Sequence, residues 1–563
     1  MAAGKAEDSL PPLEKTTGYA MYLEHVEICG FRGINHLAIS LQQVTALIGE
    51  NAWGKSSLLR ALWALLGQGE VPYQFTADDF HQAEPGTPCP PSRLQIVLTF
   101  CEYRSDMCLH SSRLSRLAPV WVKSRDGLHR IIYRAMATQE HSGNIHSAHH
   151  FLDHTGKEIT TGVQELLHLL MLMNPVLRLR DARSTRDGAG EGEVPWESLL
   201  DDCYTPLLTS DERSSAPESL QDGVNAIHHL MEHYLNSVPP IRHKPRNVRE
   251  IVSRPASLRG LGNMHTLLKG ADAKSVQLAM AGLGAAMLQA RGDREIDPEA
   301  RPILILEDPE SRLHPTMLAL AWELLELLPG QKIITTNSGD LLASMPLGNI
   351  RRLVRTPGKT LCHKLHDEQL SAEELRRIAF HVRINRPMSL FARCWLLVEG
   401  ETEIWLLSEL ASICGISFRG EGIRIIEFAQ CGVAPLTKAA SDLGIEWHLL
   451  ADGDQAGNKY ANSVRAMLKG SRESERLTLL PAKDIEHFLF QNGFAHVFRR
   501  EARAEKNPWL SNSKIIERAV NRRSKPGMAL AIVEDAEERG AEAIPPLLRQ
   551  MFSRILMLAR TQG

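Results

Sequence analysis

The chain has 563 residues, and its 43% hydrophobic and 23% charged residues are typical of a folded globular protein of several domains. The formal net charge of −3 gives no overall basic field, so nucleic-acid binding would depend on local patches. Nine cysteines without a CxxC pair argue against a disulfide framework and a cysteine-based zinc site, and no apolar run is long enough to span a membrane. We therefore expect a cytoplasmic protein with no membrane partner.

The first two thirds of the chain predict an α/β domain. The polar residues 1–20 predict a disordered arm, and 21–375 predict one domain. Within it, two strands around a turn are expected over 22–48, a helix over 55–66, further strands at 92–100, 129–136 and 302–307, and a helical, loop-rich insertion at about 160–290.

A phosphate-binding loop lies between the second predicted strand and the helix that follows it. Residues 47–59 read LIGENAWGKSSLL, which fits G-x-x-x-x-G-K-[ST] without a mismatch. The backbone N–H groups of such a loop face phosphate oxygens, Lys55 would reach the β- and γ-phosphates, and Ser56 would ligate Mg²⁺. The alternative is a glycine-rich turn with a surface lysine. We assign ATP binding in this loop to Gly49, Asn51, Gly54, Lys55, Ser56 and Ser57.

Two acids end the buried strand ILILE. Glu307 and Asp308 stand where carboxylates can hold Mg²⁺ and polarise an attacking water. A solvated acidic strand end would explain the same residues.

These segments together resemble the ATPase heads of the ABC type, and most closely the chromosome-maintenance and recombination branch. The resemblance rests on GFRGI at 30–34, the phosphate loop, EDPESRLHP at 307–315 and TTNS at 335–338. It implies that Arg32 and Asn337 contact ATP, that Glu307 is the Mg²⁺ partner and that Asp308 positions the water. The branch usually has Asp before Glu and a switch-loop His, so slow hydrolysis is expected. A weak candidate for its signature loop is 269–283, with Ser275 facing a partner's nucleotide.

A second α/β pattern, with strands alternating with helices, predicts a parallel sheet in a domain over 376–563. Glu399 and Glu403 follow the strand WLLV, while Asp452 and Asp454 follow HLLA. Carboxyl ends of parallel strands meet at one edge of a sheet, where converging carboxylates need a cation such as Mg²⁺ or Mn²⁺. Either pair alone is better explained as a solvated strand end.

Glu-Gly after one strand and Asp-x-Asp about fifty residues later resemble the Toprim fold of topoisomerases, primases and some nucleases. An ABC-type head followed by a Toprim domain resembles the OLD (overcoming lysogenisation defect) ATP-dependent endonucleases. This resemblance implies a site of two metals held by Glu399, Glu403, Asp452, Asp454 and Glu486, in addition to one metal with ATP. It also implies that Glu399 acts as general acid/base and that Lys525 neutralises charge in the transition state.

Basic residues indicate where DNA would lie. They cluster at Lys459, Arg465, Lys469, Arg499, Arg500, Arg503, Lys506, Arg522, Arg523 and Lys525, and in 178–183 and 242–260. Solvated helix faces are the alternative, and little sequence specificity is expected because nothing reads base edges. Five histidines, His141, His146, His149, His150 and His154, predict either a metal site or a polar loop.

The sequence therefore predicts an ATP-regulated, metal-dependent DNA endonuclease that forms a homodimer or higher homo-oligomer. The rival interpretation is an ATP-driven DNA-binding switch whose Toprim domain is structural or recruits a nuclease. A topoisomerase or primase is disfavoured because no active-site tyrosine context or zinc ribbon is found.

Overall fold

The computed structural model describes residues 21–67, 71–82, 93–105, 114–160, 162–179, 300–311, 318, 322, 330–468, 470, 472–506 and 509–561. The predicted N-terminal arm, most of the insertion, the signature-loop candidate with Ser275, the basic stretch 242–260 and Lys469 lie outside them. The chain divides into two compact units, 1–362 and 363–563, which we describe separately. Residue 375, near which we expected a domain boundary, lies within helix α11 (Ala372–Ile378) of the second unit.

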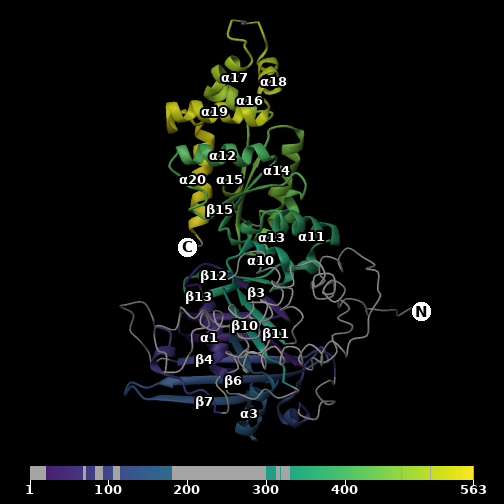
Figure 1. Cartoon of the computed structure of the whole chain (residues 1–563), viewed down its shortest axis with the longest axis vertical. Coiled ribbons are helices and arrows are strands. Elements are labelled where there is room, and N and C mark those ends of the chain that lie inside the picture. The colour runs from purple at the N-terminus through teal and green to yellow at the C-terminus, as the bar shows by residue number, and fades with distance from the viewer. Residues whose placement is uncertain are drawn as a thin grey trace, which may run out of the picture. The chain divides into compact units, whose positions relative to one another are not determined.

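The first unit contains an antiparallel sheet with strand order β2-β1-β4-β6-β7-β8, and β5 also pairs with β6. Its strands β4, β6 and β7 lie side by side in Figure 1. Side chains alternate between a buried and an open face along β1, as expected for a sheet covered on one side. Its strands are β1 (Met21–Phe31), β2 (Ile34–Ser40), β4 (Arg93–Glu102), β5 (Val122–Lys123), β6 (His129–Gln139), β7 (Ile145–Leu152) and β8 (Glu158–Ile159).

A second sheet of this unit has the order β13-β12-β3-β11-β10-β9, with β3 parallel to both β11 and β12. All five residues of β3 are buried, which explains its continuous apolar sequence. The strands are β3 (Val44–Ile48), β9 (Val176–Leu179), β10 (Ile303–Glu307), β11 (Gln331–Thr335), β12 (Ile350–Thr356) and β13 (Lys359–His363); the helices are α1 (Lys55–Leu66), α3 (Val163–Met173) and α10 (Gly339–Ser344).

The second unit is built on a fully parallel sheet of order β15-β14-β16-β17. Helices α16 to α19 pack on one another and, through α19, on α12 (Figure 1). The strands are β14 (Cys394–Val398), β15 (Ile423–Glu427), β16 (Glu446–Ala451) and β17 (Leu477–Leu479). The helices after α11 are α12 (Glu401–Ile413), α13 (Val433–Asp442), α14 (Gln455–Met467), α15 (Glu473–Arg476), α16 (Ile485–Leu489), α17 (Ala495–Glu501), α18 (Asn512–Arg523), α19 (Lys525–Arg539) and α20 (Pro546–Arg560).

The predicted α/β class and the parallel sheet of the second unit are confirmed. One count was wrong: residues 21–48 form three strands rather than two, because INHLAIS alternates buried and open positions as a strand of its own. In the described parts of the chain, no helix is long and apolar enough to cross a membrane.

Candidate functional sites

The phosphate loop connects the buried strand β3 to α1, and its two motif glycines are required by close packing. Gly54 caps α1 with a φ of 98°, and a Cβ there would lie 2.9 Å from Cγ1 of Ile34. Gly49 has a φ of 149°, and its Cβ would lie 2.8 Å from the carbonyl oxygen of Leu353. Larger residues at either position would push the loop out of its turn.

The loop lysine folds back onto its own loop. The ammonium of Lys55 donates hydrogen bonds to the carbonyl oxygens of Gly49 and, at 3.1 Å, of Glu50. Burial lowers the pKa of Lys55, and the nearby carboxylates of Asp308 and Glu310 oppose this shift. These two hydrogen bonds hold the Lys55 ammonium against the loop. A phosphate bound by the loop could accept hydrogen bonds from the same ammonium.

The other loop residues differ in their surroundings. Asn51 and Ser56 are exposed at the loop and at the start of α1. Ser57 is half-buried, and its hydroxyl accepts a hydrogen bond of 3.3 Å from the Gly33 amide. Ser57 therefore ties the turn between β1 and β2 to α1 in this structure.

Arg32, in that turn, is held by a buried acid that the sequence did not reveal. Its guanidinium lies 2.8 Å from Asp79, which is fully buried and also accepts hydrogen bonds from the Tyr73 hydroxyl at 2.8 Å and the Thr76 amide at 3.0 Å. Burial alone would raise the pKa of Asp79, but these hydrogen bonds outweigh it and lower the pKa. The guanidinium of Arg32 is thus held by Asp79, while its side chain remains 33% exposed.

At the end of β10, the two predicted acids have separate partners. Glu307 forms an ion pair with Arg178 of the neighbouring strand β9. Asp308 has a φ of 42°, a conformation that is rare outside glycine, and accepts a 3.1 Å hydrogen bond from the Thr335 hydroxyl. Arg178 is only 7% exposed, so this member of the basic stretch 178–183 is not available to DNA as we had expected.

Glu310 connects this acidic strand end to the switch segment after β11. One carboxylate oxygen accepts a 2.5 Å hydrogen bond from the Asn337 amide, and the other accepts a 2.9 Å bond from the Thr336 hydroxyl. The Glu310 carboxylate thereby holds the backbone of Asn337 in place. Asn337 itself is exposed. The motif D-P-E contains Glu310, but its sequence position alone does not reveal this contact.

In the second unit, the predicted acids gather at the carboxyl ends of β14 and β16, which are paired parallel strands. Glu399 follows β14, and Glu403, one turn into α12, accepts a 2.6 Å hydrogen bond from the Gly400 amide. Asp452 follows β16, and Asp454 caps α14 by accepting a 2.7 Å bond from the Gly457 amide. The local turns therefore orient both pairs at the same sheet edge.

The ionisation of these acids shows how crowded they are. Burial, followed by the charges of Glu403 and Glu399, raises the pKa of Asp452 to about 8. Burial is also the main reason that the pKa of Glu403 rises to about 7. The pKa of Glu399 is raised by burial and then by Asp454, and its buried Oε2 has no hydrogen-bond partner. A cation between these groups would relieve both the repulsion and the unpaired oxygen.

Two residues from distant segments complete the cluster. Glu486 on α16 is buried, and Lys525 at the start of α19 lies 3.0 Å from its Oε1. Burial alone would lower the pKa of Lys525, but the carboxylates of Glu486 and Glu403 raise it. Asp484, which no motif of the sequence singles out, adds to the repulsion around Asp452 and accepts a 2.8 Å hydrogen bond from the His487 amide.

The donor set of this acidic cluster suits a hard divalent cation, since all its anionic ligands are carboxylates. The ligand atoms of this cluster are not yet close enough together to hold one cation. Among the described residues, only Glu27, Cys29 and His36 place three potential ligand atoms within 4.8 Å of one another. The carboxylates of the acidic cluster would have to rotate inward to hold a cation together.

The predicted basic cluster is partly neutralised. Arg465 pairs with Glu473 at 2.8 Å, and Arg523 and Arg500 pair with Glu501 at 2.7 and 3.3 Å. The five histidines fall on strand β7 and its flanking turns rather than in one polar loop, and they do not form a metal group. His149 instead contacts the Tyr133 hydroxyl at 2.7 Å inside the unit, where burial lowers its pKa.

Comparison with known proteins supplies the family. Residues 21–389 match the family model described as "Protein of unknown function (DUF2813)". The chain belongs to the DUF2813 family. Residues 390–454, which carry Glu399, Glu403, Asp452 and Asp454, match the TOPRIM domain of "Overcoming lysogenization defect protein-like" proteins. This second match confirms the predicted resemblance to OLD proteins.

A relative covers nearly the whole DUF2813 chain. The protein "Uncharacterized protein YbjD" of Escherichia coli (strain K12) is 45% identical in an alignment of 552 residues that covers 96% of this chain and 99% of that protein. This alignment spans the phosphate loop and the acidic cluster alike.

Solved structures are similar to the DUF2813 protein at low sequence identity. The C-terminal region of the Burkholderia pseudomallei OLD protein is 20% identical and covers 30% of this chain and 99% of its own, with a TM-score of 0.26. The SMC head domain from Thermotoga maritima is 14% identical and covers 61% and 99%, with a TM-score of 0.29. At such scores, the fold rests on the strand orders given above.

Proposed function

We propose that this protein binds and hydrolyses ATP and is a Mg²⁺- or Mn²⁺-dependent DNA endonuclease. The observation that carries the proposal is the gathering of half-buried carboxylates at the ends of β14 and β16, where the pKa values of Asp452 and Glu403 rise to about 8 and about 7. Such shifts are common where a protein holds acids together for a cation or for catalysis. The match of this segment to an OLD-like TOPRIM domain supports the same assignment.

In the first unit, we assign ATP binding to the phosphate loop. Gly49, Gly54 and Asn51 would present the loop to the phosphates, and Lys55 would exchange its two carbonyl contacts for phosphate oxygens. Ser56, exposed at the start of α1, and Glu307 would hold the Mg²⁺ that accompanies ATP. Ser57, Arg32 and Asn337 would line the same site.

Hydrolysis in this site is expected to be slow. Asp308, which would position the attacking water, is one methylene shorter than a glutamate and is already hydrogen-bonded to Thr335. Glu307 would have to share its carboxylate between Arg178 and Mg²⁺. Asn337 can donate a hydrogen bond to phosphate or water but cannot accept a proton at neutral pH.

In the second unit, we assign metal binding to Glu399, Glu403, Asp452, Asp454 and Glu486. When bound, two divalent cations would activate the attacking water and stabilise the leaving oxygen of the phosphodiester. Glu399, whose pKa is raised by burial and by the charge of Asp454, would accept or donate the proton. Lys525 would neutralise charge that develops on the phosphate.

Partner and assembly follow from the same assignment. DNA would lie along basic residues that are exposed in the described structure, such as Lys459 and Arg522, with little sequence preference. We also propose a homodimer or a higher homo-oligomer and a cytoplasmic location. ATP would gate either the cutting step or the grip on DNA.

One observation favours the rival function, an ATP-driven DNA-binding switch with a non-catalytic or nuclease-recruiting Toprim domain. The carboxylates of the acidic cluster do not place three oxygens within 4.8 Å of one another in the described structure. In addition, the Lys525 ammonium forms an ion pair with Glu486. A site of this kind could be stabilised by lysine in place of metal.

The test is a plasmid assay with supercoiled DNA and Mg²⁺ or Mn²⁺, with and without ATP. Wild-type protein is compared with Asp452→Ala and Lys55→Ala. We expect nicked or linear product from the wild type and none from Asp452→Ala, while Lys55→Ala reveals the ATP dependence. Unchanged plasmid in every lane, with ATP still hydrolysed, would favour the switch.

A further inference from the structure

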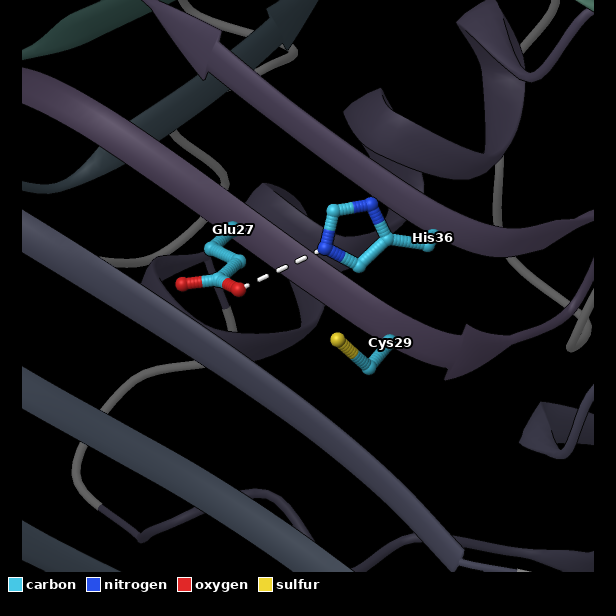
Figure 2. A group of neighbouring side chains, drawn as sticks. All are labelled: Glu27, Cys29 and His36. Carbon is cyan, nitrogen blue, oxygen red and sulfur yellow. Dashed lines mark ion pairs between the residues drawn. The ribbon is translucent and has the colours of Figure 1, made fainter. Parts of the chain in front are cut away.

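A group of three potential metal ligands lies outside both candidate sites, on the open face of the antiparallel sheet. Glu27 and Cys29 are two residues apart on β1, so their side chains extend from the same face. His36 lies directly opposite Cys29 on β2. Figure 2 shows the Cys29 sulfur directed toward the space beside the Glu27 carboxylate and the His36 ring.

The spacing of these ligands is already close to what a metal needs. One ligand atom from each residue lies within 4.8 Å of the other two, and the Glu27 Oε1 to His36 Nε2 distance is 3.5 Å. In a tetrahedral zinc site, bond lengths of about 2.0–2.3 Å separate neighbouring ligands by roughly 3.3–3.8 Å. Small side-chain rotations would therefore complete three ligand positions.

We propose that Glu27, Cys29 and His36 bind one Zn²⁺ ion, with the fourth coordination position open to water. A thiolate and an imidazole favour a borderline-soft cation over Mg²⁺, which prefers oxygen alone. This site is therefore distinct in its metal from the all-carboxylate cluster of the second unit. The half-buried Glu27 and Cys29 and the exposed His36 leave the ligands accessible from solvent.

Metal binding here would release a proton from the thiol, because the thiolate is the form that coordinates. Burial and the neighbouring Glu27 raise the pKa of Cys29, so without metal the thiol stays protonated and is a poor nucleophile. A bound divalent cation would offset the negative charge of Glu27, and the same surroundings would then favour the Cys29 thiolate.

The position of the group suggests a structural consequence. β1 and β2 are joined by the turn of Arg32 and Gly33, and the Gly33 amide donates to Ser57 of α1 at 3.3 Å. A cation joining the two strands would brace the hairpin whose turn contacts the start of the phosphate-loop helix.

The test is a zinc titration of the full-length, chelator-treated and tag-free protein. A chromophoric chelator competes for Zn²⁺, and excess Mg²⁺ keeps carboxylate-only sites filled. We expect one tight equivalent in the wild type and a loss of affinity of more than about 100-fold in Cys29→Ala and His36→Ala, since even outer partners of metal ligands contribute 10–100-fold. Co²⁺ should give a thiolate charge-transfer absorption that Cys29→Ala lacks.

The matched control is His146→Ala. His146 also pairs with a glutamate, Glu140 at 3.2 Å, on an exposed part of the same sheet, but no cysteine joins that pair. This variant should keep the wild-type zinc affinity. Wild-type affinity in Cys29→Ala, or no competitive zinc binding by the wild type, would overturn the proposal; thermal unfolding in chelator confirms that each variant is folded.

Discussion

Asp452 is a carboxyl of the acidic cluster whose pKa its surroundings shift strongly. Partial burial of its carboxyl, followed by the charges of Glu403 and Glu399, raises its pKa from 3.8 to about 8. A carboxyl with a raised pKa in the folded state stabilises the fold fully below its unfolded pKa and loses that contribution as the pH rises through the folded value. Metal-free protein should therefore become less stable toward alkaline pH.

Asp452→Asn isolates this effect, because the amide resembles the protonated acid. In chelator, the melting temperature of Asp452→Asn should exceed that of the wild type by an amount that grows between about pH 5 and about pH 9. Mn²⁺ should raise the wild-type melting temperature more than that of the variant. Thermal unfolding across this pH range, with Glu538→Gln on the exposed side of α19 as control, gives the comparison. A difference independent of pH would contradict the assigned crowding.

Glu310 gives a second prediction at this scale, for the nucleotide site. Glu310→Ala removes both contacts to the Thr336 and Asn337 segment, so the switch residue would no longer be held in place. Because misplacement of a catalytic group by about 1 Å can cost about 100-fold, we expect kcat for ATP hydrolysis to fall about tenfold to 100-fold with little change in ATP affinity. Steady-state ATPase kinetics and nucleotide titration measure the two quantities. An equal loss of both would indicate a wider collapse of the site.

At the scale of elements, the acidic cluster depends on how closely α14 approaches the end of β16. A Cβ on Gly457 would lie 1.9 Å from the carbonyl oxygen of Asp452, and a Cβ on Gly453 would lie 2.4 Å from that of Ala482. Both contacts are with backbone, which cannot rotate aside. The two glycines thus set the position of the Asp-Gly-Asp motif.

Gly457→Ala should therefore destabilise the second unit although alanine favours helices. We expect a loss of at least about 1–3 kcal/mol, the usual range for overpacking, together with loss of DNA cleavage. Gly348→Ala is the matched control, because a Cβ there meets nothing within 4 Å. Denaturant unfolding of both variants gives the free energies. If Gly457→Ala were as stable as Gly348→Ala, the close packing of α14 would be wrong.

The sequence predicts these elements well because apolar runs and strand-end motifs are local. The phosphate loop, the strand before Glu307 and the two acidic strand ends all follow from patterns a few residues long. Partners chosen by packing are not local: the Arg178–Glu307 pair joins residues 129 positions apart, and Asp79 reaches Arg32 over 47. The Glu27, Cys29 and His36 group was missed for the same reason, since strand pairing brings its ligands together rather than a CxxC spacing.

At the scale of the whole molecule, the chain carries a phosphate loop in its first unit and the acidic cluster in its second. If ATP gates cleavage, then Lys55→Ala should make the cleavage rate independent of ATP while leaving the acidic cluster intact, because Lys55 lies within the first unit. The ratio of cleavage rates with and without ATP is the measurement. If the cleavage rate of Lys55→Ala still depended on ATP as in the wild type, ATP would not act through the phosphate loop.

The proposed nuclease function is tested by measuring cleavage and DNA binding on the same samples of Glu399→Gln, with Glu538→Gln as the isosteric control. Supercoiled plasmid with Mn²⁺ reports cleavage, and the anisotropy of a labelled duplex reports binding. We expect Glu399→Gln to lose cleavage but to bind DNA within about twofold of the wild type, while Glu538→Gln retains both. Wild-type cleavage by Glu399→Gln would contradict the assignment of the acidic cluster as the nuclease centre.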